Sequence, residues 1–238
     1  MMPTLSQFSL TDLAQPLTAQ QQAAVLAQLD ALQTERLQSI CEPARLQQAL
    51  QARQQAQHLL AAAGVSTQLA QTAAGRPYAP AWPALEGLSW THCPHAAAAA
   101  LGQGRVGIDL EYPRRSTRMM ALAQRYFSPR EAAQLAATPA VELSAHFYLR
   151  WVAKEALLKA LGTGIVGGLA RFELLQTAQG WQLLTTEPGY WQVDIWQVAE
   201  RGWLALASDQ AQSWQVLHAD ISLTRICSIH KALDGDHC

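Results

Sequence analysis

The hydrophobic and polar positions of residues 18–69 predict helices. The segment is rich in Gln, Ala and Leu and contains no glycine before Gly64. We expect two helices that are separated near Pro43, because proline fits the first turn of a helix and breaks its interior. In the second helix, about residues 44–63, apolar side chains recur at helical spacing, namely Leu46, Ala49, Leu50 and Ala56.

The next segment, residues 75–94, is rich in Gly and Pro, which predicts loops and short extended pieces. A strand is predicted directly after it, at Arg105–Glu111. Its apolar side chains alternate with glycine and acidic residues, which is the pattern of a strand with one apolar and one polar face. Val106, Ile108 and Leu110 form the apolar set, and Gly107, Asp109 and Glu111 form the other.

Three helices are predicted to follow this strand. The first covers about residues 117–125, and the second starts at Ser128, where Pro129 and Glu131 complete a capping box. The third is long, about residues 141–161, and Gly162 is a suitable C-terminal stop.

The pattern then changes to strands separated by turns. The predicted strands are 170–175, 181–186, 191–198 and 203–208. The last residues, Asp220–Cys238, show no strong pattern, and we expect this tail to be partly disordered.

Composition indicates a globular chain and excludes some classes of function. Half of the 238 residues are apolar and 15% are charged, and a net charge of −1 argues against a broad nucleic-acid surface. No apolar run is long enough to span a membrane, and no secretory signal is visible. The four cysteines show neither metal-site spacing nor a disulfide framework. We therefore expect a cytoplasmic protein without nucleic-acid or membrane partners.

Two acidic residues of the predicted strand are the first candidates for chemistry. Asp109 and Glu111 project from the same face, because alternate side chains of a strand point the same way. Two neighbouring carboxylates repel each other, and a hard cation such as Mg²⁺ relieves this cost. The alternative is an edge strand with a solvated acidic face.

The lysines of the predicted long helix are the second candidates. The chain has fourteen arginines and only three lysines, two of which, Lys154 and Lys159, flank Glu155. Lysine is a compact point charge, so this helix is suited to face a small anion such as a phosphate. The alternative is an ordinary Glu–Lys pair on a helix surface.

The order and spacing of these residues resemble the phosphopantetheinyl transferases of the surfactin-synthetase-activating type. Residues 107–111, Gly-Ile-Asp-Leu-Glu, are similar to a strand motif of that family, Gly-Ile/Val-Asp-x-Glu. Residues 151–156, Trp-Val-Ala-Lys-Glu-Ala, followed by Lys159, resemble its helix motif, and residues 127–131 resemble its Phe-Ser-x-x-Glu element.

Three weaker similarities lie upstream. Gly75-Arg76-Pro77 resembles a Gly-Lys-Pro turn, with arginine in place of lysine, and His92 falls where the family has Ser-His-Ser/Thr. Arg45 and Arg53 match two arginines on the family's first long helix. The residues before His92, Ser89-Trp90-Thr91, and Cys93 after it, depart from the family pattern.

The resemblance implies an α+β fold of two halves related by a pseudo-twofold, each a small antiparallel sheet packed against a long helix. We expect residues 1–104 to form the half that binds coenzyme A. Residues 105–217 would form the half with the magnesium and catalytic residues, and 218–238 a tail.

It also implies an activity, namely transfer of 4'-phosphopantetheine from coenzyme A to a serine of an acyl, polyketide or peptidyl carrier protein by a monomeric enzyme. The implied magnesium ligands are Asp109, Glu111 and Glu155. The implied catalytic residues are Glu155, Lys159 and Lys154, and either Glu155 or a water on the metal would take the proton of the serine. The implied coenzyme contacts are Arg45, Arg53, Arg76 and His92. The alternatives are a non-catalytic coenzyme A or carrier-protein binding module and a magnesium-dependent phosphohydrolase.

Overall fold

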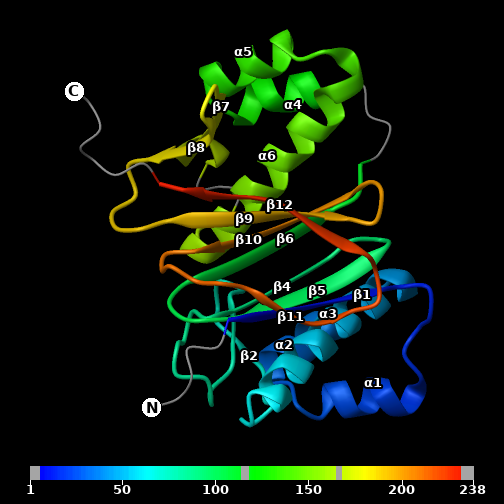
Figure 1. The fold of residues 1–238 in the computed structure, drawn as a ribbon. Coiled ribbons are helices and arrows are strands. Elements are labelled where there is room, and N and C mark those ends of the chain that lie inside the picture. The colour runs from blue at the N-terminus through cyan, green and yellow to red at the C-terminus, as the bar shows by residue number, and fades with distance from the viewer. Residues whose placement is uncertain (1–5, 114–117, 165–167, 232–238) are drawn as a thin grey trace.

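The computed structural model describes residues 6–113, 118–164 and 168–231. Two four-stranded sheets form the centre of the molecule, and a long helix covers the outer face of each, which confirms the predicted α+β class (Figure 1). The pseudo-twofold relation between the two halves remains a prediction. No helix in these residues is long and apolar enough to cross a membrane.

The first sheet has the strand order β11-β1-β5-β4. Its strands are β11 (Gln215–Ala219), β1 (Gln7–Asp12), β5 (Ala96–Leu101) and β4 (Leu88–His92). All neighbours are antiparallel except β1 and β11, which are parallel. Helix α3 (Pro43–Ala62) packs on this sheet, and α1 (Ala19–Leu26), α2 (Ala31–Gln38), β2 (Ala70–Gln71) and β3 (Pro77–Tyr78) lie beside it.

The second sheet has the strand order β12-β9-β10-β6 and is antiparallel throughout. Its strands are β12 (Leu223–His230), β9 (Gln192–Val198), β10 (Gly202–Ser208) and β6 (Val106–Glu111). Helix α6 (Ala140–Leu161) packs on β6, β10 and β9. Helices α4 (Met119–Tyr126) and α5 (Pro129–Ala137) and the hairpin β7 (Phe172–Thr177) and β8 (Gly180–Thr185) complete this half.

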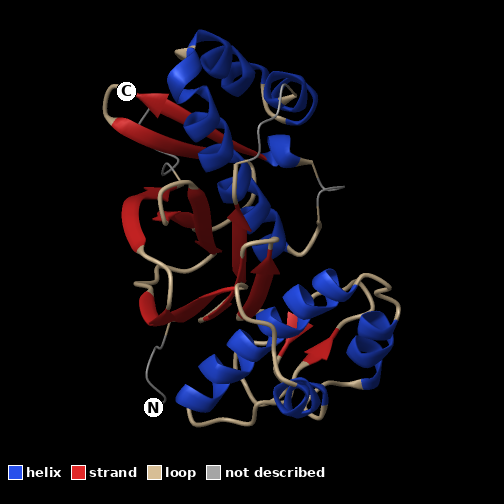
Figure 2. Cartoon of the chain, turned by 90° about the vertical axis from the view of Figure 1, so that its right-hand side faces the viewer, coloured by secondary structure: helices blue, strands red, loops and turns tan. Residues whose placement is uncertain are grey.

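The inner faces of the two sheets pack against each other. Phe8 and Leu10 of β1 share one buried cluster with Val106, Ile108 and Leu110 of β6. The apolar face predicted for residues 105–111 therefore points toward the other sheet, and Asp109 points toward α6. Figure 2 shows the helices gathered at both ends of the molecule with strands between them.

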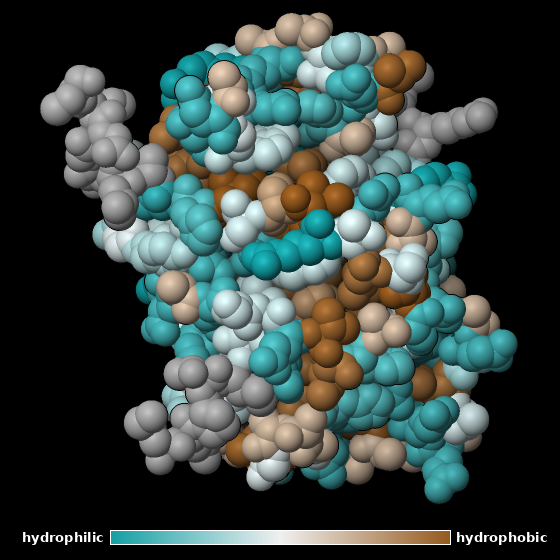
Figure 3. Space-filling view, viewed as in Figure 1, coloured by the Kyte–Doolittle hydropathy of each residue, from teal (hydrophilic) through white to brown (hydrophobic). Residues whose placement is uncertain are grey.

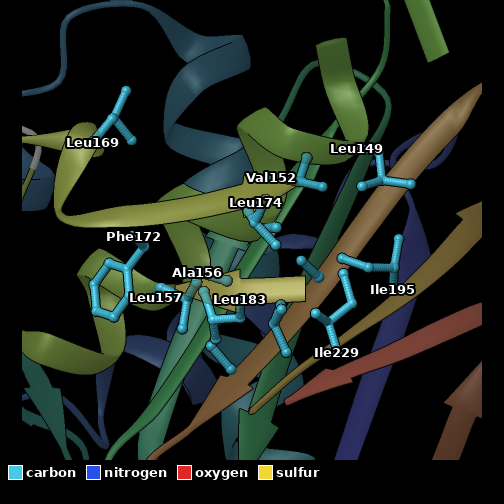
Figure 4. Close-up of a cluster of buried hydrophobic side chains, with 14 of the residues drawn as sticks. Leu149, Val152, Ala156, Leu157, Leu169, Phe172, Leu174, Leu183, Ile195 and Ile229 are labelled. Atoms are coloured by element: carbon cyan, nitrogen blue, oxygen red, sulfur yellow. The ribbon is translucent and has the colours of Figure 1, made fainter. Parts of the chain in front are cut away.

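A second apolar cluster lies between α6 and the outer face of the second sheet (Figure 4). Val152, Ala156 and Leu157 of α6 are fully buried, as are Ile195 of β9 and Ile229 of β12. Because α6 is packed on several sides, its position relative to β6 is firmly determined.

Local signals in the sequence explain where several helices begin and end. Ser128 accepts from the backbone N–H of Glu131, whose side chain accepts from the backbone of Ser128, as the predicted capping box requires. Gly162 follows α6 with a left-handed φ of 81°. Residues 18–69 form three helices rather than two, because Asp30 caps an additional helix, α2.

The C-terminal chain differs most from expectation. The predicted tail contains β12, which pairs with β9. Strand β11 spans the predicted boundary at residue 217 and pairs with β1 in the other half. The predicted half 105–217 is therefore not self-contained, since part of its chain completes the first sheet. Residues 232–238 lie outside the described residues.

Candidate functional site

The site lies where β6 crosses α6, and Gly107 is the reason these elements come so close. A Cβ atom at Gly107 would lie 1.9 Å from the carbonyl oxygen of Ala156 and 2.5 Å from the nitrogen of Ala160. Both atoms belong to the backbone of α6, so no side chain fits here. The glycine brings the face of β6 that carries Asp109 against α6.

Asp109 is buried and meets Lys159 of α6 directly. The Nζ of Lys159 donates to Asp109 Oδ1 over 2.7 Å and to the carbonyl oxygen of Ile108 over 3.0 Å. Thr91 of β4 joins the pair, because its Oγ1 donates to Asp109 Oδ1 over 3.3 Å and accepts from Lys159 Nζ over 3.2 Å. The structure thus brings together residues 91, 109 and 159 from three elements.

Glu155 lies one turn before Lys159 on α6 and is buried. Burial, reinforced by the negative charges of Asp109 and Glu111, raises the pKa of Glu155 to about 7, while Lys159 acts in the opposite direction. This carboxyl group therefore changes protonation near neutral pH, a property suited to proton transfer.

Two buried carboxylate oxygens suggest where a cation fits. Among the described residues, Asp109 Oδ2 and Glu155 Oε1 have no hydrogen-bond partner. Buried acceptors without partners are costly, and carboxylate oxygens are the ligands that Mg²⁺ prefers. No three His, Cys, Asp or Glu side chains of the described chain form a ready-made metal cluster. Glu111 is thus not assembled with the other two predicted ligands.

A pocket of about 490 Å³ opens at the end of β6, where Glu111 forms part of its wall. Arg45 and His92, two of the predicted coenzyme contacts, line it together. Loss of hydration, followed by the positive charges of Lys159, Arg53 and Arg45, lowers the pKa of His92 to about 4. The positive charges of Lys159, Arg53 and Arg45 around His92 favour an anion such as a phosphate in this pocket. The remaining lining residues are Glu42, Gln48, Cys93 and Pro94.

Arg53 does not line this pocket. It is buried, its Nε donates to Gln33 Oε1 over 2.8 Å, and its guanidinium stacks on Trp90 at 4.9 Å from the ring centre. Burial lowers the pKa of Arg53 to about 10. The positive charge of Arg53 contributes to the lowered pKa of His92. Its hydrogen bond to Gln33 joins α3 to α2.

Arg76 reaches α6 rather than the pocket of Arg45 and His92. Its Nη1 donates to the carbonyl oxygens of Lys159 and Ala160 over 3.2 and 2.9 Å, and its Nη2 donates to that of Glu86 over 3.0 Å. It lines a separate pocket of about 220 Å³ together with Lys159. Its Nη1 and Nη2 thus donate to the protein backbone, and its buried Nε has no hydrogen-bond partner among the described residues.

The position of Lys154 argues against the predicted catalytic role. Its side chain is fully buried, and its Nζ donates to Glu131 of α5 over 2.7 Å and to the carbonyl oxygen of Phe172. Glu131 also accepts from the backbone N–H groups of Ser128 and Leu174. Lys154 therefore joins α6 to α5 and β7, away from the face of α6 that meets Asp109.

Thr91 is a site residue that the sequence pattern does not single out. In the sequence it stands only among the residues before His92 that depart from the family pattern. The one hint in the sequence is that Thr91 directly precedes His92. Only the contact of β4 with β6 and α6 in the structure shows that the Thr91 hydroxyl meets Asp109 and Lys159.

Comparison with known proteins identifies one family and several similar sequences. Residues 105–212 match the family described as the 4'-phosphopantetheinyl transferase superfamily. The chain is 37% identical over 123 residues to the 4'-phosphopantetheinyl transferase HetI of Nostoc sp., a match covering 48% of this chain and 52% of that protein.

Two further comparisons cover shorter stretches. The holo-[acyl-carrier-protein] synthase of Geotalea daltonii is 48% identical over 50 residues, which are 21% of this chain and 38% of that protein. A solved structure, the Thermotoga maritima holo-[acyl-carrier-protein] synthase, has a TM-score of 0.35 and 24% identity, and the match covers 44% of this chain and 63% of that chain. The chain spans about half or less of the length of the curated relatives it matches.

Proposed function

We propose that this chain, whose residues 105–212 match the family described as the 4'-phosphopantetheinyl transferase superfamily, transfers 4'-phosphopantetheine from coenzyme A to a serine of a carrier protein. One observation carries the proposal. Asp109, Glu155 and Lys159 meet inside the matched segment, where two carboxylate oxygens lack hydrogen-bond partners and an ammonium group lies beside them. Such a site would suit a cation at the carboxylate oxygens and a phosphate at the ammonium group.

Mg²⁺ would be held by Asp109 and Glu155 and would neutralise charge on the pyrophosphate of coenzyme A. The free oxygens of the two buried residues support this assignment. Glu111, the third ligand that the resemblance implies, is not assembled with these two. Glu111 lies at the end of β6 and on the wall of the neighbouring pocket.

The protein side chains would divide the remaining tasks. Lys159, held by Asp109 and Thr91, presents a fixed positive charge to the phosphate that is transferred. Glu155, with its raised pKa, accepts the proton of the attacking serine. Arg45 and His92 bind the terminal phosphate on the adenosine side of coenzyme A in the pocket of about 490 Å³.

A transfer assay tests this proposal directly. The protein is incubated with Mg²⁺, coenzyme A and apo carrier proteins of fatty-acid, polyketide and peptide synthesis, and the products are weighed by mass spectrometry. We expect a gain of one phosphopantetheine per carrier. Coenzyme that is bound but unchanged with every carrier would instead support a binding module, and hydrolysed coenzyme would support a phosphohydrolase.

The role of Glu155 is tested by Glu155→Gln, which keeps the shape of the side chain and removes its charge. We expect transfer to fall by about 10²- to 10⁴-fold, the usual contribution of a general base. Glu142→Gln, at an exposed position of the same helix, is the matched control and should keep full activity. Full activity of the Glu155 variant would exclude it as both base and ligand.

Removal of divalent cations tests the metal separately. EDTA should abolish transfer, and excess Mg²⁺ should restore it, because charge neutralisation at the pyrophosphate is required. Transfer that continues at the same rate in EDTA would contradict the proposed magnesium site without affecting the assignment of Lys159.

A further inference from the structure

The C-terminal end of α6 is closed by a residue from the other half of the chain. A helix leaves its last carbonyl oxygens without partners inside the helix. At this end, the backbone N–H of Gly162 donates to the carbonyl oxygens of Leu158 and Lys159. The guanidinium of Arg76 donates to those of Lys159 and Ala160, so it adds to the cap and places a positive charge at the negative end of the helix dipole.

Arg76 is itself firmly held. Its backbone N–H donates to Thr72 Oγ1 over 3.0 Å, and its carbonyl oxygen accepts from the N–H of Thr72 over 2.9 Å. Its Nη2 donates to the carbonyl oxygen of Glu86, and the Glu86 carboxylate lies 3.6 Å from its Nη1. Its side chain is only 13% exposed. The guanidinium therefore connects two loops of the first half to the last turn of α6.

Gly162 makes room for this contact. A Cβ atom there would lie 2.7 Å from Arg76 Nη1, so even an alanine would push against the guanidinium. The position also has a φ of +81°, which is strained for any residue with a side chain. The chain offers a comparison at the end of α3, where Gly64 has a φ of +73° and a Cβ atom would have no neighbour within 4 Å.

The capped turn carries Lys159, whose Nζ binds Asp109 and Thr91 while its own carbonyl oxygen accepts from Arg76. We propose that Arg76 is a positioning residue that fixes the last turn of α6, so that the Lys159 ammonium stays in place over the carboxylates of the site. The planar guanidinium is suited to this task because its separate N–H groups reach carbonyl oxygens on α6 and on Glu86 at once.

The positioning role of Arg76 rests on the proposed function only where transfer activity is measured. In Arg76→Ala, we expect kcat for phosphopantetheine transfer to fall about 10-fold, since small displacements of catalytic groups cost this much or more. The affinity for coenzyme A, measured by calorimetry, should change less than about 2-fold, because the residue acts on Lys159 and not on the coenzyme. Arg76→Lys keeps the charge but not the fork, and should give an intermediate kcat.

A second readout does not depend on activity. Hydrogen exchange of the amides of residues 158–164 should become about 10-fold faster in Arg76→Ala, since the cap of this turn is lost. Gly162→Ala should reproduce both the faster exchange and the lower kcat. Gly64→Ala, with the same backbone strain but no neighbour to displace, should leave α6 exchange and kcat unchanged.

The outcomes separate this inference from its competitors. Weaker coenzyme binding with an unchanged kcat would overturn it and would assign Arg76 to the coenzyme. The positioning role would also be overturned if the amides of residues 158–164 exchanged at the unmodified rate in Arg76→Ala, Arg76→Lys and Gly162→Ala. If the unmodified protein transfers nothing to any carrier, the proposed function fails, and the exchange experiment alone still decides whether Arg76 holds α6.

Discussion

At the scale of single residues, neighbouring positions of one motif have opposite surroundings. Lys154 is buried against Glu131, while the adjacent Glu155 faces Asp109, because successive residues of a helix point about 100° apart. We expect the first to act on stability and propose that the second acts on chemistry, and each role leads to its own test.

The raised pKa of Glu155 makes the stability of the metal-free protein depend on pH. Between its ordinary value of 4.5 and about 7, the folded state keeps a proton that the unfolded chain has released. Stability should therefore fall as pH rises through this window, by up to about 3 kcal/mol, and level off above it. Glu155→Gln removes this contribution.

Urea unfolding in EDTA at intervals from pH 5 to 8 measures the effect. The free energy of unfolding of Glu155→Gln minus that of the unmodified protein should grow as pH rises. A difference that stays constant over this range would show that Glu155 titrates normally in the folded protein.

Lys154→Met should destabilise the protein by about 3–5 kcal/mol, because Glu131 would remain buried without its cation. The kcat of the folded protein at low temperature should change less than about 3-fold. Lys231→Met is a control, since that lysine donates to the Glu187 carbonyl oxygen and is only partly buried. A loss of about 100-fold or more in kcat without a loss of stability would restore the catalytic role of Lys154.

At the scale of elements, the close contact of β6 and α6 depends on Gly107. Gly107→Ala should lower the free energy of unfolding by at least about 2 kcal/mol and reduce transfer, because the added methyl group meets backbone atoms that cannot rotate away. Urea unfolding and the transfer assay measure both effects. An unchanged midpoint would mean that α6 moves away from β6 at little cost.

Elements with local signals were predictable from the sequence. Ser128 and Gly162 mark helix ends through their own side chain or backbone freedom, and the alternation at residues 105–111 predicted both the strand and its faces. Strand β5 was not predicted, since its alanines are buried on both faces and alanine favours helices. Ala98 faces the second sheet, and Ala99 belongs to the cluster under α3.

The candidate site was predictable only in part. Asp109, Glu155 and Lys159 were chosen from their motifs, and the structure brings these three together. Their partner Thr91, and the contact of Arg76 with α6, depend on distant segments meeting in space, which no local pattern encodes. The resemblance of residues 75–77 to a Gly-Lys-Pro turn implied a coenzyme contact for Arg76, whereas the structure shows backbone carbonyl oxygens as its partners.

At the scale of the whole molecule, the C-terminal chain binds the two halves together. After β10 it adds β11 to the first sheet and then returns to add β12 to the second. Both strands lie at sheet edges, and they carry exposed apolar residues, namely Val216, Leu217 and Ile226. Figure 3 shows apolar surface among polar side chains on this face.

Truncation after Ser213 should therefore damage both sheets at once. It would uncover the edges of β1 and β9, and open edges pair with other molecules. We expect lower solubility and aggregates in size-exclusion chromatography with light scattering. Truncation after Lys231, which keeps every described strand, is the control and should remain in solution. A soluble, monodisperse product of the shorter truncation would show that the two strands are dispensable.

The parallel pair of β1 and β11 also has a consequence for biosynthesis. The ribosome makes β1 before β11. Strand β11, which pairs with one edge of β1, ends at Ala219, more than two hundred residues later. At about 5–20 residues per second, β1 waits on the order of ten seconds or more for this partner. The nascent first half thus leaves the exit tunnel with an open edge, and a chaperone that shields β1 during translation should raise the yield of folded protein.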